Sequence, residues 1–211
     1  MVVGCYGDIT VFTMNNTEMA KKTSGQVSRL PQILDKAAEL FAANGYGGTS
    51  TRDIMGSLGM PSGSLYCHFP SKEDLLVAVY KVGVQHVIDV VDQALVGESD
   101  PWVRLESACA AHLQAILVDN NYAQVITKIM PEDVPSESTR LTELRDRYEM
   151  IFVKAIEDLP LPSDIPRKSL RLLLLGALNW SRIWYRPGQD TPAAIASEFV
   201  KLLKNASCTM E

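Results

Sequence analysis

Apolar residues recur every three or four positions along most of the chain after residue 28, which is the spacing of one face of an α-helix. Alternating patterns of period two, which would predict strands, are nearly absent after residue 13. The pattern therefore predicts an all-α fold of about nine helices, over residues 29–44, 50–58, 61–69, 72–96, 101–119, 122–130, 136–159, 167–185 and 191–203.

Residues typical of helix ends support these boundaries. Ser50 and Ser71 are each followed three residues later by an aspartate, so both are expected to form capping boxes. Pro101 suits a first helical position, and Thr191-Pro192 is expected to begin the last helix. Prolines at 160 and 162 should end the helix before them.

The segments on either side of Gly59 are very short helices joined by a glycine turn, which predicts a helix-turn-helix. Leu65 and Phe69 are spaced to face inward. The other side of the second segment keeps Ser62, Gly63, Ser64 and His68. Small residues at a helix N-terminus let the backbone enter a major groove, and hydroxyl and imidazole groups can contact phosphates or base edges. The motif therefore favours DNA binding.

The charge distribution reconciles DNA binding with an acidic chain. The 211 residues carry a net charge of −5, yet residues 19–72 hold six basic and three acidic side chains, a local balance of +3. A basic module on an acidic body neutralises phosphates at one end only. Residues 1–28 lack sustained periodicity and are expected to be a flexible arm, in which Lys21 and Lys22 either contact DNA or are simply solvated.

Other classes receive little support. No apolar run reaches the roughly 18 to 20 residues of a membrane helix, and Met1–Phe12 lacks the positive start of a signal peptide, so a cytoplasmic protein is expected. The four cysteines form no CxxC or Cys/His pair, so neither a metal site nor a disulfide framework is predicted. The chain lacks a GxSxG elbow, an HExxH motif and a P-loop, which disfavours an enzyme such as a thioester hydrolase.

About 45 residues resemble the N-terminal domain of the TetR family of bacterial transcriptional regulators. The resemblance rests on residues 33–41, 45–46, 48–50, 52–54 and 59–76, above all on Leu-Tyr-Cys-His-Phe at 65–69 followed by Ser-Lys-Glu-Asp-Leu-Leu at 71–76. It implies contacts to DNA from Thr51, Arg52, Ser62, Gly63, Ser64, Tyr66, His68 and Lys72. Ser62 stands where the family often has a lysine or arginine, so light base readout is expected. Tyr66 and His68 could alternatively be plain surface residues.

The same resemblance implies a body, residues 76–211, that binds a ligand and forms a dimer, behind a DNA-binding domain at 29–75. The dimer surface would come from the last two helices: Leu172, Leu173, Gly176, Ile183, Ile195, Phe199 and Leu202. One homodimer would then bind a palindromic double-stranded operator and leave it when a small-molecule effector binds. No further cofactor is expected.

Residues 175–188 also resemble the C-terminal helix of TetR proteins associated with fatty-acid, steroid-ring and other acyl-CoA catabolism. This implies an acyl-CoA effector, held by Trp102, Leu105, Cys109, Leu113, Ile116, Ile126, Met130, Tyr148, Phe152, Asn179, Trp180 and Arg182. Phosphates would meet Arg145, Arg147, Arg182 or Arg186. Trp180 and Trp184 could instead be core or interface anchors. A hydrophobic drug, with control of an efflux gene, is the alternative effector.

Overall fold

The computed structural model describes residues 29–119 and 121–208 and contains only helices and turns in these ranges, which confirms the all-α prediction. Eight α-helices and the 3₁₀ helix η1 (Ser62–Cys67) account for the nine predicted helices. The α-helices are α1 (Leu30–Asn44), α2 (Thr51–Ser57), α3 (Lys72–Ala94), α4 (Pro101–Gln114), α5 (Asn121–Lys128), α6 (Ser138–Glu157), α7 (Arg167–Trp184) and α8 (Pro192–Cys208). The arm predicted at 1–28, with Lys21 and Lys22, lies outside the described residues.

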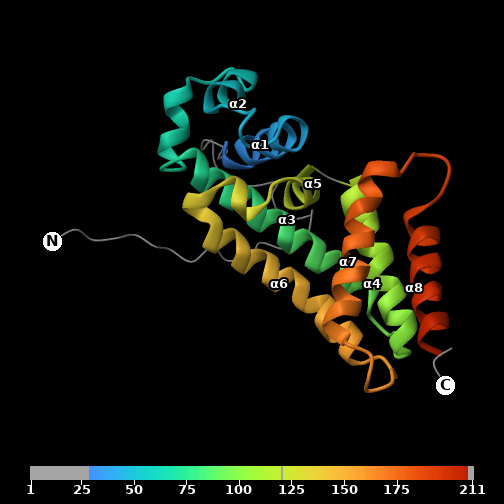
Figure 1. Cartoon of the computed structure of the whole chain (residues 1–211). Helices are drawn as coiled ribbons and strands as arrows, with labels where there is room; N and C mark the ends of the chain where they lie inside the picture. The colour runs from blue at the N-terminus through green and yellow to red at the C-terminus, as the bar shows by residue number, and fades with distance from the viewer. Residues whose placement is uncertain (1–28, 120, 209–211) are drawn as a thin grey trace, which may run out of the picture.

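The helix α1, the helix α2 and η1 form an N-terminal module at one end of the molecule (Figure 1). Their shared core contains Ile33, Phe41, Ile54 and Leu65, all fully buried, whereas Phe69 is only half-buried beside it. Gly59 has a φ of 65°, a conformation that favours glycine, and makes the turn between α2 and η1.

The second helix of the predicted helix-turn-helix is a 3₁₀ helix. The amide of Ser64 bonds to the Pro61 carbonyl at 3.0 Å, and that of His68 bonds to the Leu65 carbonyl at 2.8 Å. The segment is short and begins Ser-Gly-Ser, residues with modest helix propensity, so little favours the i to i+4 ladder.

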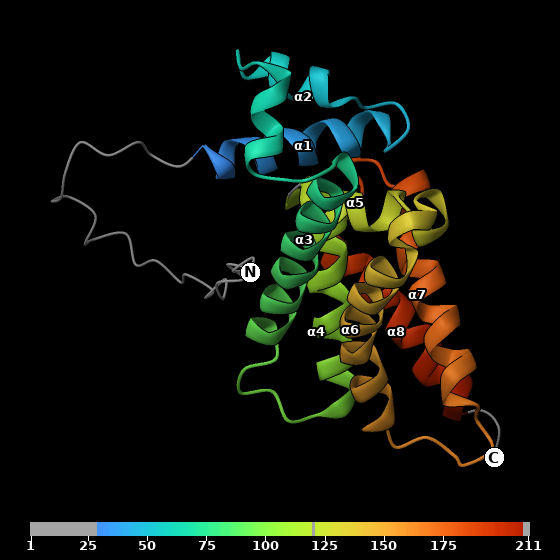
Figure 2. The same cartoon turned by 90° about the vertical axis from the view of Figure 1, so that its left-hand side faces the viewer.

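The long helix α3 joins the module to the body (Figures 1 and 2). It begins at the module, where Ser71 caps it by accepting the Asp74 amide at 3.0 Å, and runs down among the body helices. A Cβ at Gly83 would lie 2.6 Å from the Tyr122 carbonyl oxygen. Only glycine therefore lets α3 approach the backbone of α5 this closely.

The body is built around α4, which packs against α3, α6 and α8. Figure 2 shows α6, α7 and α8 beside α4, below the module. The predicted start at Pro101 is confirmed, with Asp100 capping the helix. The predicted helix to residue 119 continues as a π-helical turn over Ala115–Asp119. Thr191 accepts the Ala194 amide at 3.1 Å and so begins α8 as predicted.

Candidate nucleic-acid interface and ligand cavity

The outer surface of the module begins at α2, whose start is fixed by a capping box. The Ser50 hydroxyl accepts the Asp53 amide at 3.1 Å, and the Asp53 carboxylate accepts the Ser50 amide at 2.9 Å. Hydrogen bonds from Ser50 hold the pKa of Asp53 below its usual value. This reciprocal pair of hydrogen bonds fixes the first turn of α2. Thr51 and Arg52 lie in that turn, directly after the capping residue.

The turn before α2 is held by polar contacts with the start of α3. The Lys72 ammonium donates to the Tyr46 carbonyl at 2.6 Å and lies 3.9 Å from the centre of the Tyr46 ring. The Tyr46 hydroxyl donates to Glu73, which lowers the pKa of that carboxyl. Lys72, predicted from the resemblance to contact phosphate, thus also fixes the module internally, a role that its position in the sequence does not reveal.

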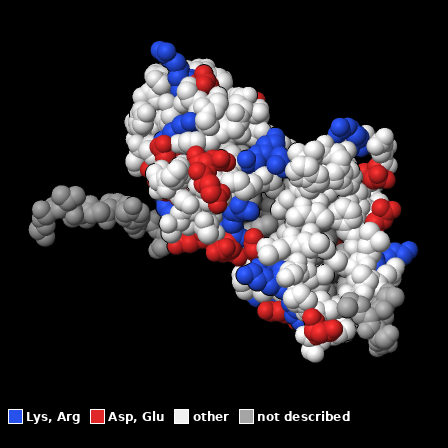
Figure 3. Space-filling view, viewed as in Figure 1, with Lys and Arg blue, Asp and Glu red and all other residues white. Residues whose placement is uncertain are grey.

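The candidate DNA contacts lie on one module but differ in exposure. Tyr66 is 57 % exposed, and Thr51, Ser64 and Lys72 are half-buried. The positions Arg52, Ser62, Gly63 and His68 are exposed as well. In Figure 3 a basic group marks the outer tip of the module with an acidic group beside it, and the larger acidic group lies lower, toward the body. The outer tip is therefore the part of the module best suited to approach phosphates.

A cavity of about 320 Å³ lies in the body between α5, α6 and α7. Six of the predicted ligand residues line it together: Ile126, Met130, Tyr148, Asn179, Trp180 and Arg182. Arg145, predicted to meet a phosphate, also lines it, and its guanidinium donates to the Met130 sulfur at 3.0 Å. The lining combines apolar side chains with two guanidinium groups and one carboxylate, that of Glu149, so its charge balance is positive. Such a cavity suits an effector that is apolar at one end and anionic at the other.

The other predicted ligand residues lie elsewhere. Trp102, Leu105, Cys109, Leu113 and Phe152 belong to the buried core and do not line this cavity. Ile116 lines a second, smaller cavity of about 160 Å³. Because α4 is covered by helices on several sides, its apolar face fills the core rather than a cavity. An amphipathic pattern cannot distinguish these two environments.

The remaining predicted arginines point away from the cavity. Arg147 lines a groove between α3, α4 and α6 and donates to Gln85 at 2.7 Å. Arg186 donates to the carbonyl of its neighbour Tyr185 at 2.9 Å.

Three polar side chains from α4, α6 and α7 meet behind the cavity wall. The Tyr148 hydroxyl contacts Nδ1 of His112, and Nε2 of His112 and Oδ1 of Asn179 are buried without a hydrogen-bond partner in the described residues. Burial lowers the pKa of His112 to about 4, with Asn179 offsetting part of the shift. His112 is therefore neutral at pH 7. Two of the three side chains face the cavity, so a bound molecule would contact this cluster directly.

One face of α7 is apolar and exposed. Leu173 is 65 % and Trp180 is 62 % exposed, and Leu172, Ile183 and Trp184 are exposed as well. Of the residues predicted for a dimer surface, Gly176 and Leu202 are also exposed, Phe199 is half-buried and Ile195 is buried within the subunit. Exposed apolar surface of this kind marks an interaction site.

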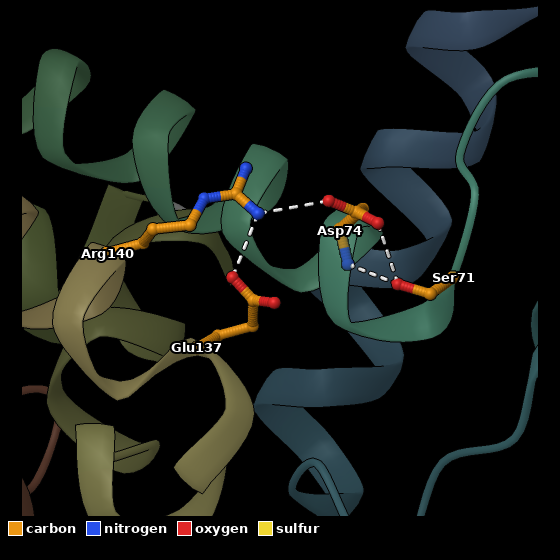
Figure 4. Close-up of polar contacts among 4 residues, drawn as sticks. All are labelled: Ser71, Asp74, Glu137 and Arg140. Carbon is orange, nitrogen blue, oxygen red and sulfur yellow. Dashed lines mark hydrogen bonds and ion pairs between the residues drawn. The ribbon is translucent and has the colours of Figure 1, made fainter.

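Polar contacts from α5 and α6 connect the body to the module and to the start of α3. The Tyr122 hydroxyl of α5 donates to Asp35 of α1 at 2.7 Å. Arg140 of α6 forms ion pairs with Asp74 of α3 at 3.0 Å and with Glu137 at 2.8 Å (Figure 4). Hydrogen bonds from Arg140 and Ser71 lower the pKa of Asp74. Movements of α5 or α6, which line the cavity, would therefore reach the module.

A helix-turn-helix module on a helical body with a partly open cavity is typical of the class of DNA-binding transcriptional regulators. The model of bacterial regulatory proteins of the tetR family matches residues 33–79, and that of the tetracyclin repressor-like C-terminal domain matches residues 98–206. The chain belongs to the TetR family. Its members are regulators rather than enzymes, which confirms the prediction that the chain is not an enzyme.

Curated relatives match most of the chain. The repressor KstR2 of Mycolicibacterium smegmatis is 31% identical over 180 residues, covering 81% of this chain and 86% of its own. KstR2 of Rhodococcus jostii is 28% identical over 191 residues, covering 87% of this chain and 93% of its own.

Solved structures show the same fold. AibR, in complex with isovaleryl coenzyme A and operator DNA, aligns with a TM-score of 0.72 at 22% identity, covering 82% of this chain and 97% of its own. A tetR-family regulatory protein from Rhodococcus RHA1 aligns with a TM-score of 0.68 at 25% identity, covering 86% of this chain and 97% of its own. Within the described residues, the helices are too short or too polar to cross a membrane.

Proposed function

We propose that the chain is a cytoplasmic homodimeric repressor that leaves a palindromic operator when an acyl-CoA thioester binds. The observation that carries the proposal is the cavity between α5, α6 and α7, which combines apolar side chains with Arg145 and Arg182 against the single carboxylate of Glu149. The relatives named as KstR2 repressors agree with repression, and the solved complex of AibR with isovaleryl coenzyme A agrees with this effector class.

The proposed operator contacts come from α2, η1 and the start of α3. Tyr66, His68 and Lys72 would hold phosphates, Thr51 and Arg52 would contact the backbone or a base, and Ser62, Gly63 and Ser64 would face base edges. Short or small side chains at 62–64 support close approach of the backbone to the groove. Because Ser62 lacks a long cationic side chain, sequence preference would depend on Arg52 and on DNA shape.

The proposed dimer interface is the exposed apolar face of α7 together with Leu202 of α8. A two-fold interface places the same patch on both subunits, so a self-complementary apolar face suits it. Trp180 lies on this face and also lines the cavity. Effector binding and subunit contact would therefore share one side chain.

The test is release of the DNA upstream of the chain's own gene, followed by fluorescence anisotropy. Isovaleryl-CoA, a long-chain acyl-CoA and a steroid-derived CoA thioester would be compared with their free acids and with free coenzyme A. We expect one thioester to release the DNA and its free acid to leave it bound. Release by hydrophobic drugs, with persistent binding under every thioester, would instead favour the efflux alternative.

A matched pair of variants locates the effector. Arg145→Met removes a charge from the cavity, and Arg147→Met removes one from the groove on the other side of α6. We expect R145M to raise the thioester concentration needed for release at least tenfold and R147M to leave it within twofold. The reverse order would place the effector in the groove between α3, α4 and α6.

A further inference from the structure

A second cavity lies where α5 ends beside the π-helical turn and the C-terminal end of α7. Its volume is about 160 Å³, and Thr127, Lys128 and Arg182 are among its lining residues. Since one water molecule occupies about 30 Å³ of liquid, this space is sufficient for a phosphoryl group. Lys128 was not among the residues predicted from the sequence, where it is one more basic residue on a helix.

Lys128 and Arg182 are like charges at one cavity. Within the described residues, neither side chain forms an ion pair with a carboxylate. Burial, and then the charge of Arg182, lower the pKa of Lys128. Each cation therefore disfavours the other, and an anion between them would relieve that repulsion.

The Lys128 ammonium also connects α5 to the DNA-binding module. It donates to the Ala42 carbonyl at 2.5 Å and to Oε1 of Gln124 at 3.3 Å. Ala42 lies in the last turn of α1, where carbonyls lack partners within the helix and a nearby cation is favourable. Lys128 thus fastens the C-terminal end of α1 to the body.

The two cavities are neighbours, because Thr127 and Arg182 line both. A single molecule can therefore place an apolar part between α5, α6 and α7 and an anionic part beside Lys128.

We propose that Lys128 and Arg182 bind a phosphate group of the effector, and that Lys128 thereby exchanges the Ala42 carbonyl for the phosphate and releases the last turn of α1. The exchange is favourable because an ammonium bonds more strongly to an anionic oxygen than to a neutral carbonyl. This inference rests on the proposed function in one respect only, that the phosphate belongs to the effector.

The first experiment measures binding of inorganic pyrophosphate to the full chain by calorimetry at constant ionic strength, without DNA. We expect Lys128→Met and Arg182→Gln each to weaken binding at least tenfold, and Lys128→Arg to stay within threefold. Lys168→Met is the matched control, because Lys168 is an exposed lysine near the opposite end of α7 from Arg182. It should stay within twofold. The inference would be overturned if the wild type did not bind pyrophosphate, or if K128M and R182Q bound it as tightly as the wild type does.

The second experiment follows amide hydrogen exchange at residues 42–46. We expect saturating pyrophosphate to speed exchange there at least fivefold in the wild type. K128M should exchange at the faster rate from the start and should not respond. If saturating pyrophosphate left the exchange rate of the wild type unchanged, the release of the last turn of α1 would be refuted, even if the calorimetry showed that pyrophosphate binds.

Coenzyme A and an acyl-N-acetylcysteamine thioester separate the sources of the anion. Coenzyme A should bind through Lys128 as pyrophosphate does, whereas the thioester without phosphates should be insensitive to K128M. If pyrophosphate binds as expected but no acyl-CoA releases DNA, the phosphate site stands and the proposed effector fails. If acyl-CoA releases DNA equally well from K128M, the effector stands and this inference fails.

Discussion

The N-terminal module and the helical body differ in how many of their polar side-chain groups have hydrogen-bond partners. In the module, Ser50, Lys72 and Tyr46 all find polar partners within the chain. Within the described residues, four buried side-chain nitrogen or oxygen atoms have no hydrogen-bond partner, and all four belong to the body. They are on His86, His112, Arg171 and Asn179. The body also holds the cavities and most of the exposed large apolar side chains.

This difference indicates where each region meets its partners. The module is internally complete and can present a fixed polar surface to DNA. The body leaves apolar surface uncovered, and uncovered surface of this kind is stabilised by association. Substitutions on the surface of the module should therefore change the recognition of DNA. Substitutions in the body should change dimer assembly and the response to ligand.

The largest expected effect comes from a charge on the uncovered face of the body. Leu173→Glu should leave the subunit folded, because this side chain is 65 % exposed. It should weaken the dimer at least a hundredfold, since an unpaired carboxylate would be buried at the interface. Sedimentation velocity would show monomers where the wild type shows dimers. A dimer that survives L173E would place the interface elsewhere.

The next effect concerns the helix that joins the two regions. Gly83→Ala should lower the free energy of unfolding by about 2 to 3 kcal/mol, because its Cβ would meet the backbone of Tyr122. Gly56→Ala in α2 is the control, because a Cβ there has no atom within 4 Å. That change should be neutral or slightly stabilising. Urea unfolding of both variants measures the contrast, and equal values would contradict the close approach.

The buried histidine should make the stability of the body depend on pH. Its folded pKa of about 4 lies below the ordinary value of 6.5, so the unfolded chain binds the extra proton between those values. Stability from this group is complete above pH 6.5 and is lost as the pH falls toward 4. From pH 7 to 5 the wild type should lose roughly 2 kcal/mol, and His112→Asn should lose clearly less. Parallel losses in both would exclude His112 as the cause.

The smallest effect tests how the module divides its work. Tyr66→Ala should weaken binding about tenfold to every operator variant, or roughly 1.4 kcal/mol, because a phosphate contact carries no sequence information. Ser64→Ala should change the preference among variants instead. Anisotropy with a panel of single-base operator variants compares the two. Equal losses for S64A on every variant would contradict this assignment.

Local sequence signals predicted the fold well. The capping serines at 50 and 71 and the prolines at 101 and 192 mark helix starts through interactions within a few residues, and the structure confirms them. The form of η1 was not predictable, because six residues are too few for the spacing of apolar positions to distinguish a 3₁₀ helix from an α-helix.

The cavity was predictable only in part. Residues of α6 and α7, such as Tyr148 and Asn179, line it, whereas the apolar face of α4 fills the core. Both faces show the same helical periodicity, and only the packing of helices distant in sequence separates them. The Gly83 approach and the contact from Lys128 to Ala42 are likewise long-range, so no local pattern announces them.

The 3₁₀ form of η1 alters the length of the recognition segment. Ser62 and Cys67 are five residue steps apart, which is about 10 Å along a 3₁₀ helix but about 7.5 Å along an α-helix. The difference of about 2.5 Å is most of the roughly 3.4 Å spacing of successive base pairs. The two ends of η1 are therefore farther apart, by most of one base step, than they would be on an α-helix.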